Sequence, residues 1–178
     1  MNFLPKDINQ DSLLKKLREI NWKISKLLKS YSKNTNNQEE YQRKLKISDF
    51  SSGPVTEADI KVNKIIITEL MNFSNQWEIL SEENIKGSKG ISFKNDWVWI
   101  IDPLDGTKDF IQNTGEYGVH MALSFKKQIV FSSVLIPSKN ELWLFLKNKG
   151  TWFELENQRR DFLPKVDKKE FREMKVVI

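Results

Sequence analysis

A short apolar run that ends abruptly in two aspartates constrains the fold of this chain more than any other feature. Residues 97–101 read Trp-Val-Trp-Ile-Ile, a mixture of aromatic and β-branched side chains that favours a buried β-strand. Pro103 and Gly106 follow directly and forbid the regular continuation of a strand. The sequence therefore predicts a strand that delivers Asp102 and Asp105 to a turn at its carboxyl end.

Asp102 and Asp105 lie close enough around this turn for their carboxylates to point at one spot. Two neighbouring anions repel each other, and a divalent cation offsets that repulsion. Carboxylate oxygens are hard ligands, which favours Mg²⁺ or Mn²⁺ over Zn²⁺. The alternative is an Asx-turn between a strand and a helix, in which Asp105 or Thr107 acts only as a cap.

A second acidic pair follows another short apolar run, residues 77–80. Glu82 and Glu83 come directly after Ser81. If the two runs are neighbouring strands, their ends meet, and Glu82 joins the two aspartates in a carboxylate cluster able to hold more than one ion. The alternative is a solvated turn, which is the commoner place for such a pair.

A third segment, residues 53–59, reads Gly-Pro-Val-Thr-Glu-Ala-Asp and predicts the start of a helix that runs to about Met71. Thr56 and Asp59 have the spacing of a capping box, although Glu or Gln is more usual than Asp at the second position. A plain helix cap therefore explains both residues without any chemistry.

In this order, the three segments resemble the lithium-sensitive, Mg²⁺-dependent phosphatases of the inositol monophosphatase superfamily. The pattern of that family reads V-T-x-A-D, then E-E, then W-x-x-D-P-[IL]-D-G-T. This chain supplies residues 55–59, 82–83 and 99–107 with similar spacings. The resemblance implies the N-terminal domain of the sugar-phosphatase fold.

The residues after the third motif are more similar to 3'(2'),5'-bisphosphate nucleotidases than to inositol monophosphatases. Residues 108–111 read Lys-Asp-Phe-Ile and residues 115–117 read Gly-Glu-Tyr, as the nucleotidases tend to. The resemblance therefore implies release of the 3'-phosphate from 3'-phosphoadenosine 5'-phosphate, a reaction of sulfur metabolism. The alternative substrates are inositol 1-phosphate or another sugar phosphate.

The resemblance also implies a role for each residue of the motifs. Glu82, Asp102 and Asp105 would ligate Mg²⁺ through their carboxylates, and Leu104 would ligate it through its backbone carbonyl. Glu83 would hold a third, more weakly bound ion through water. The complete enzyme would thus bind two or three Mg²⁺ ions, with Mn²⁺ as a substitute.

Catalysis, on the same resemblance, would depend on Asp59 and Thr107. Thr107, hydrogen-bonded to Asp59, would orient and help to deprotonate a metal-bound water. The backbone N–H groups of Gly106 and Thr107, at a helix N-terminus, would donate hydrogen bonds to the substrate phosphate, with Lys108 on the substrate side. Water would then attack in line, without a phosphoenzyme.

One motif of the family is missing. The family places a further metal-ligating aspartate in a Trp-Asp-x-Ala segment of a second domain, and none of the six tryptophans here precedes an aspartate. Residues 1–173 therefore resemble the N-terminal metal-binding domain, and residues 174–178 read as the start of a C-terminal domain. The chain alone would bind metal yet turn over poorly. The other alternative is a catalytically incomplete remnant that only binds metal.

Composition excludes several other kinds of site. The absence of cysteine rules out disulfides and thiolate ligands, and a single histidine argues against a His-based zinc site. No apolar run reaches membrane-spanning length and no signal-peptide pattern opens the chain, so we expect a cytoplasmic protein without membrane insertion. The resemblance is compatible with a monomer or a homodimer.

The net charge of +5 does not predict nucleic-acid binding. Residues 1–48 hold 11 basic and 5 acidic side chains, and the rest of the chain holds 18 basic and 19 acidic ones. The basic excess lies on a predicted first helix and its connector, so a solvated helix face explains it. The partner that the family resemblance implies is a small phosphomonoester, an adenosine bisphosphate. The apolar face of that helix comprises Leu13, Leu17, Ile20, Ile24, Leu27 and Tyr31.

Four apolar segments after the motifs predict an antiparallel meander. With two long helices before it, the meander predicts an α+β fold, a helix pair packed against a mostly antiparallel sheet. His120, within the first strand, is expected to be structural, and residues 32–47, 158–161 and 167–169 are expected to form exposed connections. The strands cover residues 119–125, 128–136, 141–146 and 151–155.

Overall fold

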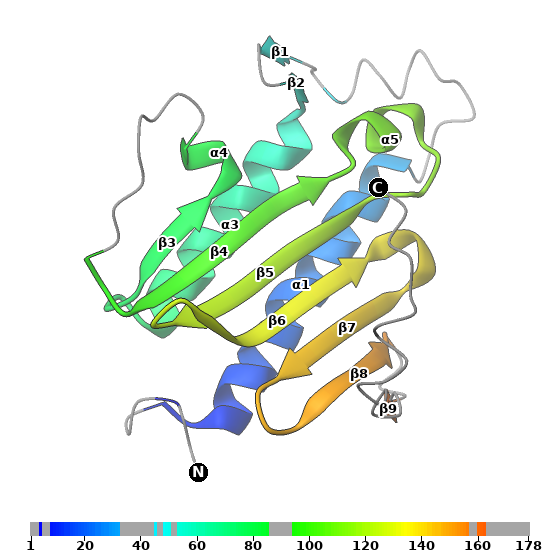
Figure 1. Cartoon of the computed structure of the whole chain (residues 1–178). Helices are drawn as coiled ribbons and strands as arrows, with labels where there is room; N and C mark the ends of the chain where they lie inside the picture. Colours follow the sequence, from blue (N-terminus) through cyan, green and yellow to red (C-terminus); the bar gives the residue numbers. More distant parts are fainter. Residues whose placement is uncertain are drawn as a thin grey trace, which may run out of the picture.

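The computed structural model describes residues 4, 8–32, 45, 48–50, 53–85, 94–156 and 160–162. Seven strands form one sheet, in the order of the chain, and only the first pair is parallel (Figure 1). The predicted α+β fold is confirmed. The strands are β3 (Glu78–Ser81), β4 (Trp97–Asp105), β5 (Gly118–Phe125), β6 (Gln128–Ile136), β7 (Glu141–Leu146), β8 (Gly150–Leu155) and β9 (Arg160–Phe162).

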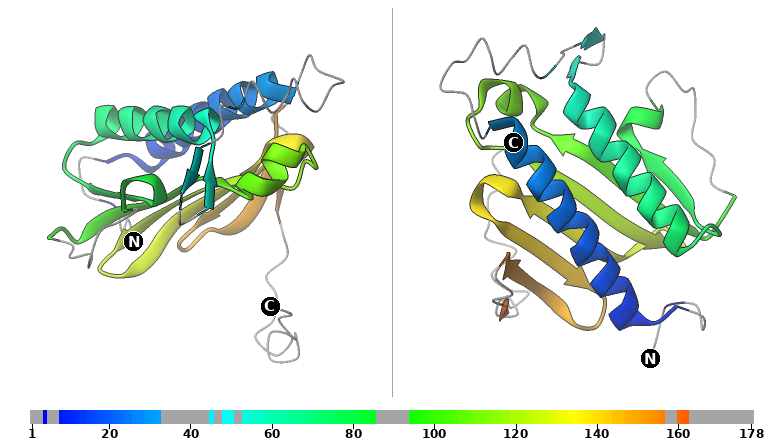
Figure 2. Two further views of the ribbon diagram at one scale, coloured as in Figure 1. Left: turned by 90° about the horizontal axis from the view of Figure 1, so that it is seen from above. Right: turned by 180° about the vertical axis from the view of Figure 1, so that it is seen from behind.

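Two long helices lie on the same face of this sheet (Figure 2). They are α1 (Gln10–Ser32) and α3 (Glu57–Phe73). None of the helices among the described residues is long and apolar enough to cross a membrane. The short elements are β1 (Ser48–Phe50), β2 (Gly53–Val55), α4 (Glu82–Ile85), α5 (Thr107–Gln112) and the 3₁₀ turn η1 (Pro137–Lys139).

Both long helices form where the sequence predicts them. On α1 the predicted apolar face is buried, except that Leu27 is only partly covered. α3 begins with the predicted capping box, because Thr56 and Asp59 each accept a hydrogen bond from the backbone of the other, and it ends at Phe73. Burial of these two apolar faces against the sheet forms the core of the domain.

The sheet supplies the other half of the core through side chains that lie opposite one another in neighbouring strands. Trp99, Leu123, Phe131 and Leu146 form one such row, and each is at most 1% exposed. Trp97 stacks on Phe125 with ring centroids 4.4 Å apart. The two tryptophans before the aspartates therefore pack the sheet, as their alternation with Val98 predicts.

The structure changes two expectations about strand ends. β4 continues through Pro103 to Asp105, with an irregular register in which Asp102 lies opposite His120 and Asp105 opposite Gly118. One extra residue of β4 fits between these pairs as a β-bulge, so a proline without an N–H is tolerated there.

Arg160–Phe162, whose first two residues were expected to form an exposed connection, is instead strand β9, paired with β8. Most of residues 32–47, all of residues 167–169 and the predicted boundary at residues 173–174 lie outside the described part of the chain.

Candidate metal and phosphate site

The acidic residues of the second and third motifs meet because β3 and β4 are parallel neighbours. In their register Ser81 lies opposite Ile101, so the next residues, Glu82 at the start of α4 and Asp102 in β4, come close together. This is the arrangement predicted from the two apolar runs. The bulge in β4 then turns the chain so that Asp105 remains near Asp102.

Asp102 is the centre of the acidic cluster. The pKa of its carboxyl is raised from 3.8 to about 7. Burial is the largest cause, followed by the negative charges of Glu82 and Asp105 and by a hydrogen bond with Glu82. A hydrogen bond from the Leu104 N–H to Asp102 Oδ1, 3.2 Å long, acts in the opposite direction. The protein therefore holds three carboxylates close together at an energetic cost.

This donor set fits a hard divalent cation. Glu82, Asp102 and Asp105 offer only carboxylate oxygens, and their mutual repulsion is what such an ion offsets. Leu104 O, the predicted backbone ligand, accepts a hydrogen bond of 3.0 Å from Thr107 and has a second lone pair. Within the described part of the chain, no three acidic or histidine side chains are close enough to enclose an ion, so the carboxylates are neighbours rather than a closed cage.

Asp59 and Thr107 are joined directly, although they lie far apart in the chain. Thr107 Oγ1 is 3.2 Å from Asp59 Oδ1, as the resemblance implies. The other carboxylate oxygen, Oδ2, accepts bonds of 2.8 Å from the Thr56 N–H and 2.5 Å from the Thr56 hydroxyl. The capping box and the contact with Thr107 therefore coexist, and neither interpretation of Asp59 excludes the other.

Asp59 is also buried, with 2% of its surface exposed. Burial raises the pKa of this carboxyl, and the hydrogen bonds from Thr56 and Thr107 oppose the rise. A buried carboxyl held in this way is suited to exchange a proton with the Thr107 hydroxyl.

Gly106 gives the turn before α5 its shape. Its φ of +78° lies in the left-handed region, and a Cβ here would come within 2.8 Å of Glu116 O. α5 begins at the next residue, and Gly106, its N-cap, makes no side-chain capping hydrogen bond. The predicted phosphate donors, the N–H groups of Gly106 and Thr107, therefore lie in a turn that requires glycine.

The remaining predicted residues lie at the edge of this site. Glu83 is half-buried, one residue beyond Glu82 on α4, and Lys108 is exposed in the first turn of α5. Their positions are compatible with the roles implied by the resemblance, which stay predictions.

Two residues at the site were not assigned a role from the sequence. Asn63 on α3 accepts a 2.7 Å bond from Ser81 and donates a 3.2 Å bond to Asn84, which fixes the turn that carries Glu82. Its spacing of four residues from Asp59, one helical turn, was the available signal. His120 was expected to be only structural, and its Nε2 lies 3.7 Å from Asp105 Oδ2.

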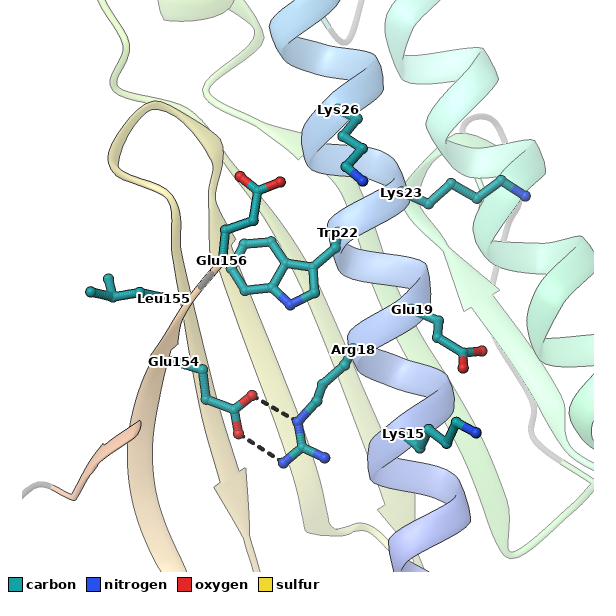
Figure 3. A pocket seen from close by; sticks show the side chains of 9 residues that line it. All are labelled: Lys15, Arg18, Glu19, Trp22, Lys23, Lys26, Glu154, Leu155 and Glu156. Atoms are coloured by element: carbon teal, nitrogen blue, oxygen red, sulfur yellow. Dashed lines mark hydrogen bonds and ion pairs between the residues drawn. The ribbon is translucent and has the colours of Figure 1, made fainter. Parts of the chain in front are cut away.

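A cavity of about 630 Å³ lies elsewhere, between α1 and β8 (Figure 3). Two of the charged residues that line it form an ion pair, in which Arg18 donates two 2.7 Å hydrogen bonds to the carboxylate of Glu154. Glu154 Oε1 also accepts a 2.8 Å bond from Trp152 Nε1. We interpret this cavity as part of the helix–sheet packing and not as the reactive site.

Comparison with known proteins identifies a matching family. Residues 9–175 match the model of the inositol monophosphatase family. The chain is 33% identical over 110 residues to the 3'(2'),5'-bisphosphate nucleotidase CysQ of Escherichia coli, which covers 61% of this chain and 43% of that protein. It is 30% identical over 105 residues to the fructose-1,6-bisphosphatase/inositol-1-monophosphatase of Thermotoga maritima, covering 59% and 39%.

The fold is also similar to that of solved structures. The extragenic suppressor protein SuhB of Bartonella henselae superposes with a TM-score of 0.66 at 24% identity, covering 83% of this chain and 53% of that one. The chain thus spans about half the length of the proteins that it matches.

Proposed function

Because the chain belongs to the inositol monophosphatase family, we propose that it forms the metal-binding half of a Mg²⁺-dependent, lithium-sensitive phosphomonoesterase. The observation that carries this proposal is the meeting of Glu82, Asp102 and Asp105 beside the Thr107–Asp59 hydrogen bond. Glu82 and Asp105 help to raise the pKa of Asp102, so holding the three carboxylates together lowers the stability of the fold unless a cation binds there.

Thr107 would handle the proton of the attacking water. Its hydroxyl can donate to Asp59 Oδ1 or to Leu104 O, which leaves an oxygen lone pair for a water. As the water gives its proton to Thr107 Oγ1, Thr107 would pass its own proton to Asp59. Bound Mg²⁺ would supply a lowered water pKa and would neutralise charge on the phosphoryl oxygens.

The N–H groups of Gly106 and Thr107 would hold the phosphate in line with that water, with Lys108 on the substrate side. Positioning and electrostatic stabilisation are the main sources of catalysis in phosphoryl transfer, so this arrangement needs no covalent intermediate.

We propose 3'-phosphoadenosine 5'-phosphate as the substrate, with the 3'-phosphate released. The nucleotidase-like residues 108–111 and 115–117 and the similarity to CysQ support this choice. A sugar phosphate is the second candidate, because the Thermotoga maritima relative is named for fructose-1,6-bisphosphatase and inositol-1-monophosphatase activities. Since the chain spans 43% of the Escherichia coli protein, full turnover would need the remaining half.

The test is phosphate release by the chain from 3'-phosphoadenosine 5'-phosphate and from inositol 1-phosphate, each with Mg²⁺, with Mg²⁺ and Li⁺, and with EDTA. Calorimetric titration with Mg²⁺ alone gives a readout that does not depend on turnover. We expect Mg²⁺ binding and slow, nucleotide-selective, Li⁺-sensitive release that EDTA abolishes.

The matched controls are Asp102→Asn, which removes one predicted ligand, and Asp96→Asn, which removes an aspartate of similar type in an exposed turn. We expect at least a hundredfold loss of release in the first and none in the second. Mg²⁺ binding without release would leave a catalytically incomplete domain, and equal Mg²⁺ binding by Asp102→Asn would contradict the proposed metal site.

A further inference from the structure

The Asp105 carboxylate has less support than its neighbours in the acidic cluster. Its side chain is 59% exposed, and among the described residues its one ion-pair or hydrogen-bond partner is the imidazole of His120. Asp102 differs, because it accepts a hydrogen bond from the Leu104 N–H. A carboxylate that rotates freely loses entropy when it binds an ion, so a group that orients Asp105 in advance would favour metal binding.

The strand register brings His120 to the predicted metal ligands. On β5 it lies directly opposite Asp102 of β4, and Gly118, two residues earlier, lies opposite Asp105. Residues opposite one another in antiparallel strands share a face of the sheet, as do residues two apart along one strand. The His120 side chain therefore starts opposite Asp102 and has to lean along β5 by two residues to reach Asp105.

Gly118 leaves the space for this lean. A Cβ at position 118 would come within 3.4 Å of His120 Nε2 and 3.7 Å of its Cδ2, so the imidazole lies over the bare backbone of the glycine. With the ring in this place, Nε2 is 3.7 Å from Asp105 Oδ2. The absence of a side chain at Gly118 thus allows the imidazole to face the carboxylate.

Core packing does not account for a histidine at this position. Its neighbours on β5, Val119 and Met121, are at most 1% exposed and belong to the core, whereas the His120 side chain is 44% exposed. Val134 lies opposite it on β6, and both residues line a hollow of about 340 Å³ that Asp105 also borders. The ring therefore buries little apolar surface, and its polar edge faces the acidic cluster.

The two ring nitrogens are not equivalent in this arrangement. A neutral imidazole carries a proton on one nitrogen and a lone pair on the other, and the nitrogen nearest to Asp105 is Nε2. With the proton on Nε2, the ring can donate to the carboxylate. A separation of 3.7 Å is longer than a direct hydrogen bond, and a small rotation of either partly exposed side chain closes it.

We propose that His120 is a positioning residue for the metal site, whose Nε2–H holds Oδ2 of Asp105 and leaves Oδ1 free to bind Mg²⁺. This inference rests on the proposed function and adds a residue that lies in none of the family motifs. Groups that hold metal-binding carboxylates in place commonly contribute about ten- to a hundredfold to metal affinity. His120 acts through Asp105 and needs no contact of its own with the ion.

The test is calorimetric titration of the chain and two matched amide variants with Mg²⁺, which requires no turnover. His120→Gln places an amide nitrogen as far from the backbone as Nε2, whereas His120→Asn places it only as far as Nδ1, too short to reach Asp105. We expect the Gln variant to bind Mg²⁺ within about threefold of the wild type, and the Asn variant about tenfold more weakly. Urea unfolding should show equal stability, because the replaced side chain is partly exposed.

A double-mutant cycle assigns the effect to Asp105. In an Asp105→Ala background, His120→Asn should cause no further loss of Mg²⁺ affinity, because the carboxylate that it orients is gone. Wild-type affinity in the Asn variant, equal losses in the Gln and Asn variants, or a loss that persists in the Asp105→Ala background would overturn this inference and leave the metal site standing. A wild-type chain that binds no Mg²⁺ would overturn the proposed metal site, and this inference with it.

Discussion

Glu154 and Asp102 are carboxylates on the same sheet, and their surroundings are opposite. Glu154, on the helix-facing side, is 3% exposed and accepts two hydrogen bonds from Arg18 and one from Trp152. Asp102, near the carboxyl end of β4, interacts instead with the negative charges of Glu82 and Asp105. Charge is neutralised by the protein at the first position and concentrated at the second.

The difference separates a structural carboxylate from a functional one. A buried ion pair with all of its bonds made contributes to one defined packing of α1 on the sheet. A cluster of like charges lowers stability, and a protein retains it where a cation or substrate supplies the missing charge. Asp59 is intermediate, because it is buried and its hydrogen bonds come from hydroxyl and backbone groups rather than from a cation.

The largest effect is expected from breaking the neutralised site. Arg18→Ala removes one positive charge and two hydrogen bonds from the buried Glu154 carboxylate, which should lower the free energy of unfolding by about 3 kcal/mol. Urea unfolding at pH 7 measures it. Lys15→Ala, an exposed lysine on the same helix, should change stability by less than about 0.5 kcal/mol. Similar losses in both variants would mean that the ion pair has no special structural role.

Removing a charge from the acidic cluster should raise the free energy of unfolding instead of lowering it. The pKa of Asp102 is raised from 3.8 to about 7, so its contribution to stability is complete below the unfolded value and is lost as the pH rises through about 7. Asp102→Asn should therefore make the metal-free chain more stable at pH 8, by on the order of 2 kcal/mol.

The measurement is the free energy of unfolding of both proteins in EDTA from pH 4 to pH 8. The gap should open above about pH 3.8 and level off above pH 7. With excess Mg²⁺ the wild type should gain stability and the variant should not. A gap that is constant with pH would show that folding does not raise the pKa of Asp102.

The intermediate site predicts an intermediate loss. Thr56→Ala removes the side-chain cap of α3 and the hydrogen bond from the Thr56 hydroxyl to Asp59 Oδ2, while the backbone N–H still donates to that oxygen. This should cost about 1–2 kcal/mol and raise the pKa of Asp59 further. Thr56→Ser retains the hydroxyl and should stay within about 0.5 kcal/mol of the wild type. Urea unfolding of the three proteins checks the order, which an equal loss in both variants would contradict.

The smallest effect concerns an ion pair on the surface. Lys16 and then Lys23 lower the pKa of Glu69 to about 2 through bonds of 2.6 and 2.8 Å. The stabilisation that these ion pairs give is complete above about pH 4.5 and is lost as the pH falls through about 2. Glu69→Gln should cost only about 0.5 kcal/mol at pH 7, and 0.5 M NaCl should reduce this further. A loss above about 2 kcal/mol would mean that Glu69 stabilises the fold as strongly as the buried Glu154 does.

Local patterns predicted most of the elements. The three- and four-residue steps on α1, the capping box of Thr56 and Asp59, and the alternation in the meander each depend on neighbours in the sequence. The same patterns did not predict β9, because a strand of three residues forms only where a neighbouring strand offers its edge. The continuation of β4 past Pro103 was missed for a similar reason, since a bulge is a property of the paired strand.

The candidate site divides in the same way. The residue types and their order specified the carboxylates, the glycine turn and the family, because each motif is a local requirement of backbone or ligand chemistry. The tertiary structure decided that Glu82 lies beside Asp102, that Thr107 bonds to Asp59, and that Asn63 and His120 border the cluster. It also decided that Arg18 neutralises Glu154 whereas Asp102 lies beside other carboxylates. Only folding brings such distant charges together, at positions where solvent screens them less than in the unfolded chain.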